Sequence, residues 1–120
     1  LVDAKTKAVV SRDRLEIIRF FEEKLGELAY EQLELFPEER KERMAKVKKW
    51  LEVDLNEALI SCATKRAKRD KKGYRQCLQT AFATLDRLEH LLTYQAHVTG
   101  MNMTVIDVLL WPILLRIDHV

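Results

Sequence analysis

Apolar residues recur at intervals of three and four through the middle of this chain. The stripe consists of Met44, Val47, Leu51, Leu55, Ala58 and Cys62. A repeat of this period places all of its apolar side chains on one face of an α-helix. Pro37 fits the first position of such a helix, and Glu38 and Glu39 suit the positive end of its dipole. The spacing predicts one long amphipathic helix that begins after Pro37 and runs to about Arg69.

A second apolar stripe follows Gly73, which interrupts the first pattern. The sequence YRQCLQTAFATLDRLEHLL, residues 74–92, has the same helical period. Its predicted buried face consists of Leu78, Ala81, Phe82, Leu85, Leu88 and Leu92. The whole chain has only three glycines and two prolines, so few positions favour tight turns. We therefore expect two long antiparallel helices that pack through their apolar faces.

The segment TVIDVLLWPILLRI, residues 104–117, is apolar around almost its whole circumference. A helix of this kind is surrounded by other elements, so we predict a central bundle helix that is buried on every side. The residues expected to be nearly inaccessible are Leu109, Leu110 and Leu114. The segment is shorter than the roughly 18 residues that cross a bilayer, so the sequence predicts no membrane span.

The first 26 residues have a different pattern. LVDAKTKAVV reads as a β-hairpin, with strands at Leu1–Val2 and Ala8–Val10 and a turn around Ala4–Lys7. SRDRLEIIRFFEEKLG reads as a helix that begins at the N-cap Ser11 and stops at Gly26. Its expected buried stripe consists of Leu15, Ile18, Phe21 and Leu25.

These patterns predict a mainly α fold with three parts. Residues 1–26 form a hairpin and a helix, residues 27–37 form a linker, and residues 38–120 form a helical bundle. Two strands alone are barely stable in water, so the hairpin should join a sheet that lies outside this sequence. We therefore expect the chain to be part of a longer polypeptide.

Composition excludes little beyond disorder. Hydrophobic residues make up 48% of the chain and charged residues 33%, which allows a packed core. The net charge of +2 is too small to indicate a nucleic-acid or membrane partner by itself. No signal-peptide pattern is present, and we expect an intracellular protein, cytoplasmic or organellar.

Few residues have the spacing of a reactive or metal-binding site. Cys62 and Cys77 are too far apart for a Cys-x-x-Cys motif and lie on apolar stripes, so we interpret them as small buried hydrophobes. His90, His97 and His119 share no ligand or catalytic spacing. Thr104 can cap the helix after it, and Asp107 can bond back to the cap's N–H, which gives both a structural role. We predict no catalytic residue and no metal ligand.

A run of basic residues ends the first long helix. KRAKRDKK has six cations and one acid, and the cations are Lys65, Arg66, Lys68, Arg69, Lys71 and Lys72. One interpretation is a solvated helix end whose cations suit the negative end of the dipole. The other is a patch that contacts phosphate groups, RNA included, or an acidic partner. No aromatic residues are interleaved, so base stacking is not indicated.

Three stretches together resemble the glutathione transferase superfamily, and within it the glutathionyl-hydroquinone reductases of the Xi class. YRQCLQTAFATLDRLEHLL is similar to a family helix with a Phe-Ala-x-Leu-Asp-x-Leu-Glu core. GMNMTVIDVLLWPILLRID is similar to the family's Gly-x-x-x-Thr-x-x-Asp-x-x-Leu-x-Pro run, which continues to Arg-Phe-Asp. LVDAKTKAVVSRDRLEIIR is similar to the last hairpin and helix of its thioredoxin-like half. The resemblance implies a glutathione-transferase-type helical domain over residues 38–120.

The resemblance also implies a glutathione contact at Asp13 and Arg14, although both positions depart from the family pattern. Members of the family bind the glutamyl end of glutathione with a Glu-Ser pair. In this chain Asp13 and Arg14 stand at those two positions. Asp13 could accept from the ligand's amino group or be an ordinary first-turn acid, and Arg14 lacks the small hydroxyl but could attract the carboxylate. The stretch LNEALISCA has no counterpart of the family's substrate-facing Tyr. The family's Cys-Pro-Trp nucleophile motif does not occur among these residues.

Two functions follow from the resemblance. In the first, the parent polypeptide is a glutathione-dependent transferase or reductase that acts on glutathionyl-hydroquinones, with glutathione as its cofactor and this chain as one wall of the pocket. In the second, the chain is a non-catalytic scaffold in a larger protein or ribonucleoprotein complex. Either way we expect protein partners, namely the remaining thioredoxin-like half, a homodimer or a larger complex. For this chain alone we expect neither catalysis nor a cofactor.

Overall fold

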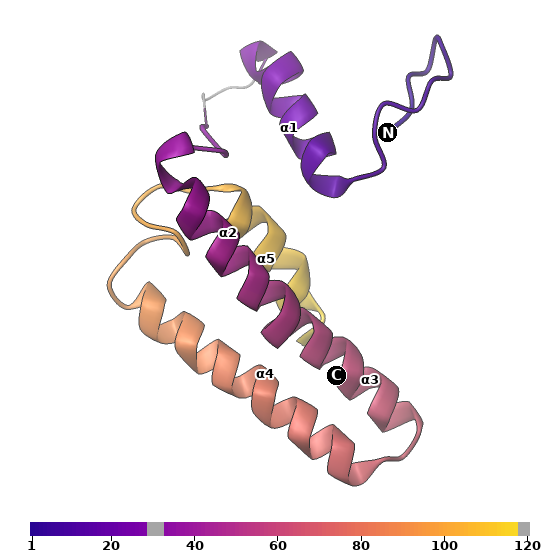
Figure 1. The fold of residues 1–120 in the computed structure, drawn as a ribbon, viewed down its shortest axis with the longest axis vertical. Helices are drawn as coiled ribbons and strands as arrows, with labels where there is room; N and C mark the ends of the chain where they lie inside the picture. The colour runs from indigo at the N-terminus through magenta and orange to yellow at the C-terminus, as the bar shows by residue number, and fades with distance from the viewer. Residues whose placement is uncertain (29–32, 118–120) are drawn as a thin grey trace. The chain divides into compact units, whose positions relative to one another are not determined.

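The structure is a computed structural model that describes residues 1–28 and 33–117, without the side chain of residue 67. It divides into two units, residues 1–35 and 36–120. Helices dominate both units, as the sequence predicts. In chain order the elements are α1 (Arg14–Leu25), η1 (Gly26–Leu28), η2 (Glu38–Arg40), α2 (Lys41–Trp50), η3 (Leu51–Asn56), α3 (Glu57–Ala67), α4 (Lys71–Leu92) and α5 (Val105–Leu115) (Figure 1).

The expected N-terminal hairpin is reduced to one bridge. Val2 and Val9 form a single antiparallel β-bridge, and the backbone N–H of Val10 donates to the carbonyl of Leu1 at 2.9 Å. Lys7, in the turn, has φ of +59°. Both bridge residues are exposed, so the ladder has no apolar face to hold it and does not extend into strands.

The helix α1 begins two residues later than the sequence suggests. Asp13, rather than Ser11, is the N-cap, because its Oδ1 accepts from the N–H groups of Leu15 and Glu16 at 2.9 and 3.1 Å. Gly26 does not stop the chain in a left-handed conformation, since it continues as the helical turn η1.

The prediction of a buried apolar stripe on α1 was wrong. No residue of α1 is buried, and Phe21 and Leu25 are 45% and 41% exposed. Among its described residues, the first unit offers α1 no sheet or second long helix to pack against.

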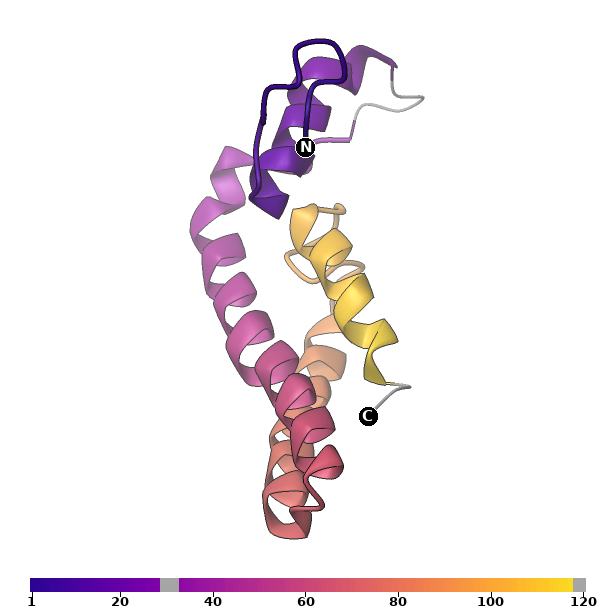
Figure 2. The ribbon, with the colours of Figure 1, turned by 90° about the vertical axis from the view of Figure 1, so that its right-hand side faces the viewer.

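The predicted long helix of the second unit is present from residue 41 to 67, after the short turn η2. All six residues of the predicted stripe are buried, and Leu55 and Cys62 are fully inaccessible. The run is not a uniform α-helix, because η3 in its middle is a π-helical segment. The run curves along its length (Figure 2), and a π-helical insertion is a recognised cause of bending.

The helix α4 returns antiparallel to this run and packs against α3 and η3 (Figure 1). Its buried residues are Ala81, Thr84 and Leu88, whereas Phe82 is 54% exposed and Leu92 is 39% exposed. The prediction from the sequence was therefore wrong about Phe82 and Leu92, and it did not include Thr84 in the buried face. Thr84 can be buried because its hydroxyl donates to the carbonyl of Thr80 at 2.9 Å.

The break between these helices lies before Gly73, not at it. Arg69 adopts φ of +56°, and Asp70 is the N-cap of α4, accepting from the N–H of Gly73 at 2.9 Å. Gly73 is thus in the first turn of α4. A capping Asp followed by a helix is itself a start signal, which explains the turn's position.

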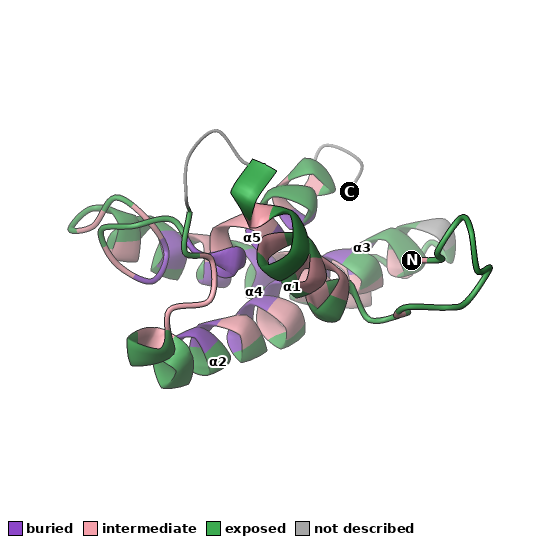
Figure 3. Cartoon of the chain, turned by 90° about the horizontal axis from the view of Figure 1, so that it is seen from above, coloured by how far each residue is buried: buried purple, intermediate pink, exposed green. Residues whose placement is uncertain are grey.

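The helix α5 packs against α2 and η3 with one side only. It buries Val105, Ile106, Leu109, Leu110 and Ile113. Trp111 is 65% exposed and Leu115 is 51% exposed, so the prediction of burial on every side was wrong. Leu114 is half-buried rather than inaccessible. Buried residues gather where α2, α4 and α5 face one another (Figure 3).

The loop before α5 is held by Asp107. Its Oδ2 accepts from the backbone N–H of Thr104 at 2.9 Å, and its Oδ1 accepts from the N–H of Val98 at 2.9 Å. The hydroxyl of Thr104, which is fully buried, lies 2.9 Å from that of Thr99. Gly100 has φ of +151°, a conformation open essentially to glycine alone. These bonds tie the connection between α4 and α5 to the start of α5.

Candidate functional site

The predicted glutathione contacts lie at the start of α1, in the first unit. Asp13 is exposed, and both hydrogen bonds that it accepts as N-cap fall on its Oδ1 atom. Ser11 lies close by: its Oγ accepts from the N–H of Asp13 at 3.1 Å and donates to Oε2 of Glu16 at 2.6 Å. Arg14 follows as the first helical residue and is exposed. The carboxylate of Asp13 therefore has a structural role that any ligand contact would share.

The predicted basic residues lie at the closed end of the α3–α4 hairpin, in the second unit (Figure 1). Lys65 and Arg66 end α3, and Lys71 and Lys72 begin α4. We call the tip of this hairpin, with Lys65, Arg66, Lys68, Arg69, Lys71, Lys72 and Arg75, the basic tip. The turn thus collects cations from both helices on one protrusion.

One acid interrupts the basic tip. Asp70 forms an ion pair with Lys65, whose Nζ lies 3.3 Å from Oδ2 of Asp70. The hydrogen bond from the Gly73 backbone N–H, followed by the bond from Lys65, holds the pKa of Asp70 below its usual value. Asp70 therefore stays ionised, and it is engaged within the turn.

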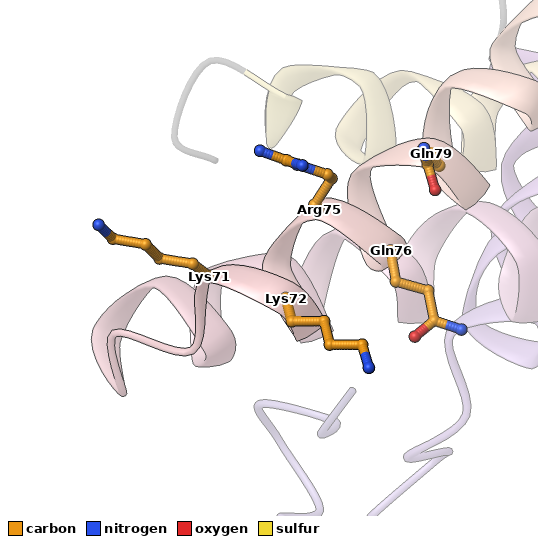
Figure 4. Close-up of a pocket in the computed structure, with 5 residues that line it drawn as sticks. All are labelled: Lys71, Lys72, Arg75, Gln76 and Gln79. Carbon is orange, nitrogen blue, oxygen red and sulfur yellow. The ribbon is translucent and has the colours of Figure 1, made fainter.

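Two hollows border the basic tip. A hollow of 260 Å³ is lined by Lys65, Arg66, Arg69, Asp70, Lys71 and Tyr74. A larger hollow of 610 Å³ is lined by Lys71, Lys72, Arg75, Gln76 and Gln79 (Figure 4). Arg75, Gln76 and Gln79 escaped the sequence analysis because the charge run ends at Lys72. Arg75 and Gln76 lie three and four residues after Lys72, and Gln79 lies three after Gln76, which was the helical signal that could have included them.

The two cysteines lie on packed helices, α3 and α4. Cys62 is fully buried and Cys77 is half-buried. Burial, followed by the neighbouring Cys77, raises the pKa of the Cys62 thiol, which disfavours the reactive thiolate. Among the described residues, no group of three or more His, Cys, Asp or Glu side chains is placed to hold a metal ion. His97 lies near Asp107 and His90 stacks edge-on with Tyr94, while His119 falls outside the described residues.

In the described part of the chain, no helix combines the length and the apolar character that a membrane span requires.

Known proteins match the chain over its whole length. No protein-family model matches. Glutathionyl-hydroquinone reductase YqjG of Escherichia coli K12 is 26% identical over 120 residues, which are all of this chain and 36% of that protein. The chain resembles the glutathione transferases of the Xi class. This chain therefore spans little more than a third of the length of YqjG, the curated relative that it matches.

Solved structures agree with the sequence match. The glutathione-bound structure of YqjG, a glutathione transferase homologue, superposes with a TM-score of 0.83 at 25% identity, covering 99% of this chain and 38% of that one. Glutathione transferase Xi 1 of Trametes versicolor gives a TM-score of 0.79 at 26% identity, covering 98% of this chain and 40% of that one. The family resemblance and the fold predicted from the sequence are both confirmed.

Proposed function

We propose that this chain is part of a glutathione-dependent transferase or reductase that acts on glutathionyl-hydroquinones. The observation that carries the proposal is the match to a glutathionyl-hydroquinone reductase, which runs through both units of the chain. The likeness to a glutathione-bound homologue supports glutathione as the cofactor of the whole protein. We also infer that the protein acts inside the cell.

The proposal assigns different parts of the reaction to different parts of the protein. Residues 1–26 would be the end of a thioredoxin-like half, residues 27–37 a linker, and residues 38–120 the helical domain. A thiolate elsewhere in the thioredoxin-like half would attack the sulfur of the glutathionyl thioether and release the hydroquinone, which takes up a proton. A second glutathione would then resolve the mixed disulfide, giving oxidised glutathione and the free thiol. The helical domain would form a wall of the substrate pocket.

Asp13 and Arg14 would bind the glutamyl end of glutathione. The charge of Asp13 suits the ligand's amino group, and the exposed position of both residues leaves them accessible. Arg14 carries a positive charge where the family has a hydroxyl, so it would attract the ligand's carboxylate from a greater distance.

Titration calorimetry with glutathione on the full-length polypeptide tests the proposal. Asp13→Asn is the informative variant, because Asn still caps the helix but loses the charge. We expect its affinity to fall by tenfold or more, whereas Glu23→Ala, at an exposed acid farther along α1, should bind like the parent. Unchanged affinity for glutathione in Asp13→Asn would show that the charge of Asp13 does not contribute to binding. No detectable heat with any form would overturn the enzymatic proposal.

The alternative is a non-catalytic scaffold in a larger protein or ribonucleoprotein assembly. Its support comes from the sequence departures at Arg14 and in residues 55–63, and from the basic residues between 65 and 72. In that case partner binding would persist in a protein that gives no heat with glutathione.

A further inference from the structure

The basic tip is strongly positive. Residues 65–75 contain seven Lys or Arg and one Asp, a net charge of +6. Because the whole chain carries only +2, the remaining residues together carry −4. A second positive stretch lies in η2 and α2, where residues 40–49 contain six Lys or Arg and one Glu, a net charge of +5. The basic tip is therefore one of two strongly positive stretches, and a concentration of this kind favours association with a polyanion.

Helix stability accounts for only some of these cations. Lys65 and Arg66 suit the C-terminal end of α3, but Lys71 and Lys72 lie in the first turn of α4, which contains no acid. Cations are unfavourable there because the helix dipole places positive charge at its N-terminus. The carboxylate of Asp70 already caps this end of α4, so Lys71 and Lys72, rather than the helix terminus, would attract a bound anion.

The chemistry of the surface distinguishes between two classes of partner. Protein interfaces have an apolar core and few lysines, whereas nucleic-acid interfaces are polar and strongly positive. Within the basic tip itself, no described large apolar side chain is exposed, while Lys68, Lys71 and Lys72 are. Ile60 and Phe82 are exposed farther along α3 and α4. Gln76 and Gln79 add amide donors to the cations that line the larger hollow. Cations and amides together are the usual contacts to phosphate and sugar.

The arrangement of the side chains indicates an extended ligand. In Figure 4, Lys72 and Gln76 extend from one side of α4, whereas Arg75 and Gln79 extend from another. Their ends diverge, so they do not converge on one small anion. A strand that runs along the hairpin end could contact them in succession.

We propose that the basic tip binds the phosphate backbone of nucleic acid, without sequence preference. The contacts come from the cations of the α3–α4 turn and continue along α4 through Arg75, Gln76 and Gln79. The proposal uses no residue of α1 and does not depend on whether the whole protein uses glutathione.

Fluorescence anisotropy with a labelled 20-nucleotide single-stranded RNA of mixed sequence tests the proposal on the full-length polypeptide. The logarithm of the affinity should fall linearly with the logarithm of the salt concentration, with a slope of about −2 to −3.5 for roughly three to five phosphate contacts. The double variant Lys71→Gln/Lys72→Gln should bind about tenfold more weakly at low salt, and its slope should be smaller in magnitude by about 1.4.

A charge-matched control separates the site from net charge. Lys46→Gln/Lys49→Gln removes two exposed cations from α2 and should change the affinity by less than about twofold. Equal losses in the two double variants, with helical circular dichroism retained, would show that no localised site exists. Absence of binding at low salt would overturn the proposal, and so would displacement of the RNA by polyglutamate at equal charge concentration, which would indicate an acidic protein partner instead.

Discussion

Residues 1–35 and 36–120 differ in what lies against their apolar side chains. In the second unit, the stripe from Met44 to Cys62 is buried, with α4 and α5 packed against the helical run that carries it. In the first unit, α1 has a similar helical period but no buried residue. The contrast shows that periodicity decides whether a helix forms, whereas burial also needs an opposing surface.

The largest expected effect comes from deleting one side chain in each unit. Leu55→Ala should lower the free energy of unfolding by about 3 kcal/mol, because it opens a cavity at a fully buried site. Phe21→Ala should cost less than about 1 kcal/mol, because its side chain is 45% exposed. Urea unfolding followed by circular dichroism measures both values. A loss for Phe21→Ala as large as that for Leu55→Ala would mean that α1 is covered in solution.

Two glycines sharpen the same comparison through the backbone. Gly100→Ala should cost about 2 kcal/mol, since φ of +151° is strained for alanine and the new Cβ would lie 3.2 Å from the Arg40 guanidinium. Gly26→Ala should be neutral or stabilising by up to about 1 kcal/mol, because Gly26 is helical and a Cβ there meets nothing within 4 Å. Thermal unfolding of the two variants measures both changes in stability. An equal loss of stability in the two variants would contradict the backbone roles assigned to Gly100 and Gly26.

The smallest effect concerns two carboxylates, one in each unit. Backbone N–H groups of Thr6 and Lys5 lower the pKa of Asp3, and the Gly73 N–H followed by Lys65 lowers that of Asp70. A carboxyl with a depressed folded-state pKa stabilises the fold above its unfolded pKa of about 4, and this contribution is lost as the pH falls through the folded value. NMR titration should place both below 3.8. Asp70→Asn should reduce the acid sensitivity of the second unit, and an unshifted Asp70 would contradict the geometry of the turn.

Sequence alone predicted much of the helical bundle, because the stripe of residues 44–62 combines a strict period with few helix breakers. It missed the π-helical segment Leu51–Asn56, which no residue type in that stretch signals. It overestimated the burial of α5. The apolar side chains of a helix show which faces can be buried, but they do not show which other elements will pack against those faces. Trp111 illustrates the limit: its side chain is 65% exposed although every neighbour in sequence is apolar.

The candidate sites were less predictable than the fold. The charge run located the basic tip, but only the geometry of the hairpin adds Arg75, Gln76 and Gln79 to it. Asp13 was expected as a first-turn acid or a ligand contact, and the structure shows it as the N-cap in place of Ser11. Both sets of site residues remain predictions until binding is measured.

Hydrogen exchange resolved along the chain tests most directly whether only the second unit forms its own core. Backbone amides in residues 44–62 and in the middle of α4 should exchange slowest, because their hydrogen bonds open only when the bundle unfolds. Val9 and Val10, which are 53% and 43% exposed beside a single β-bridge, should show weak protection. Protection of residues 1–28 as strong as that of residues 44–62 would contradict the account.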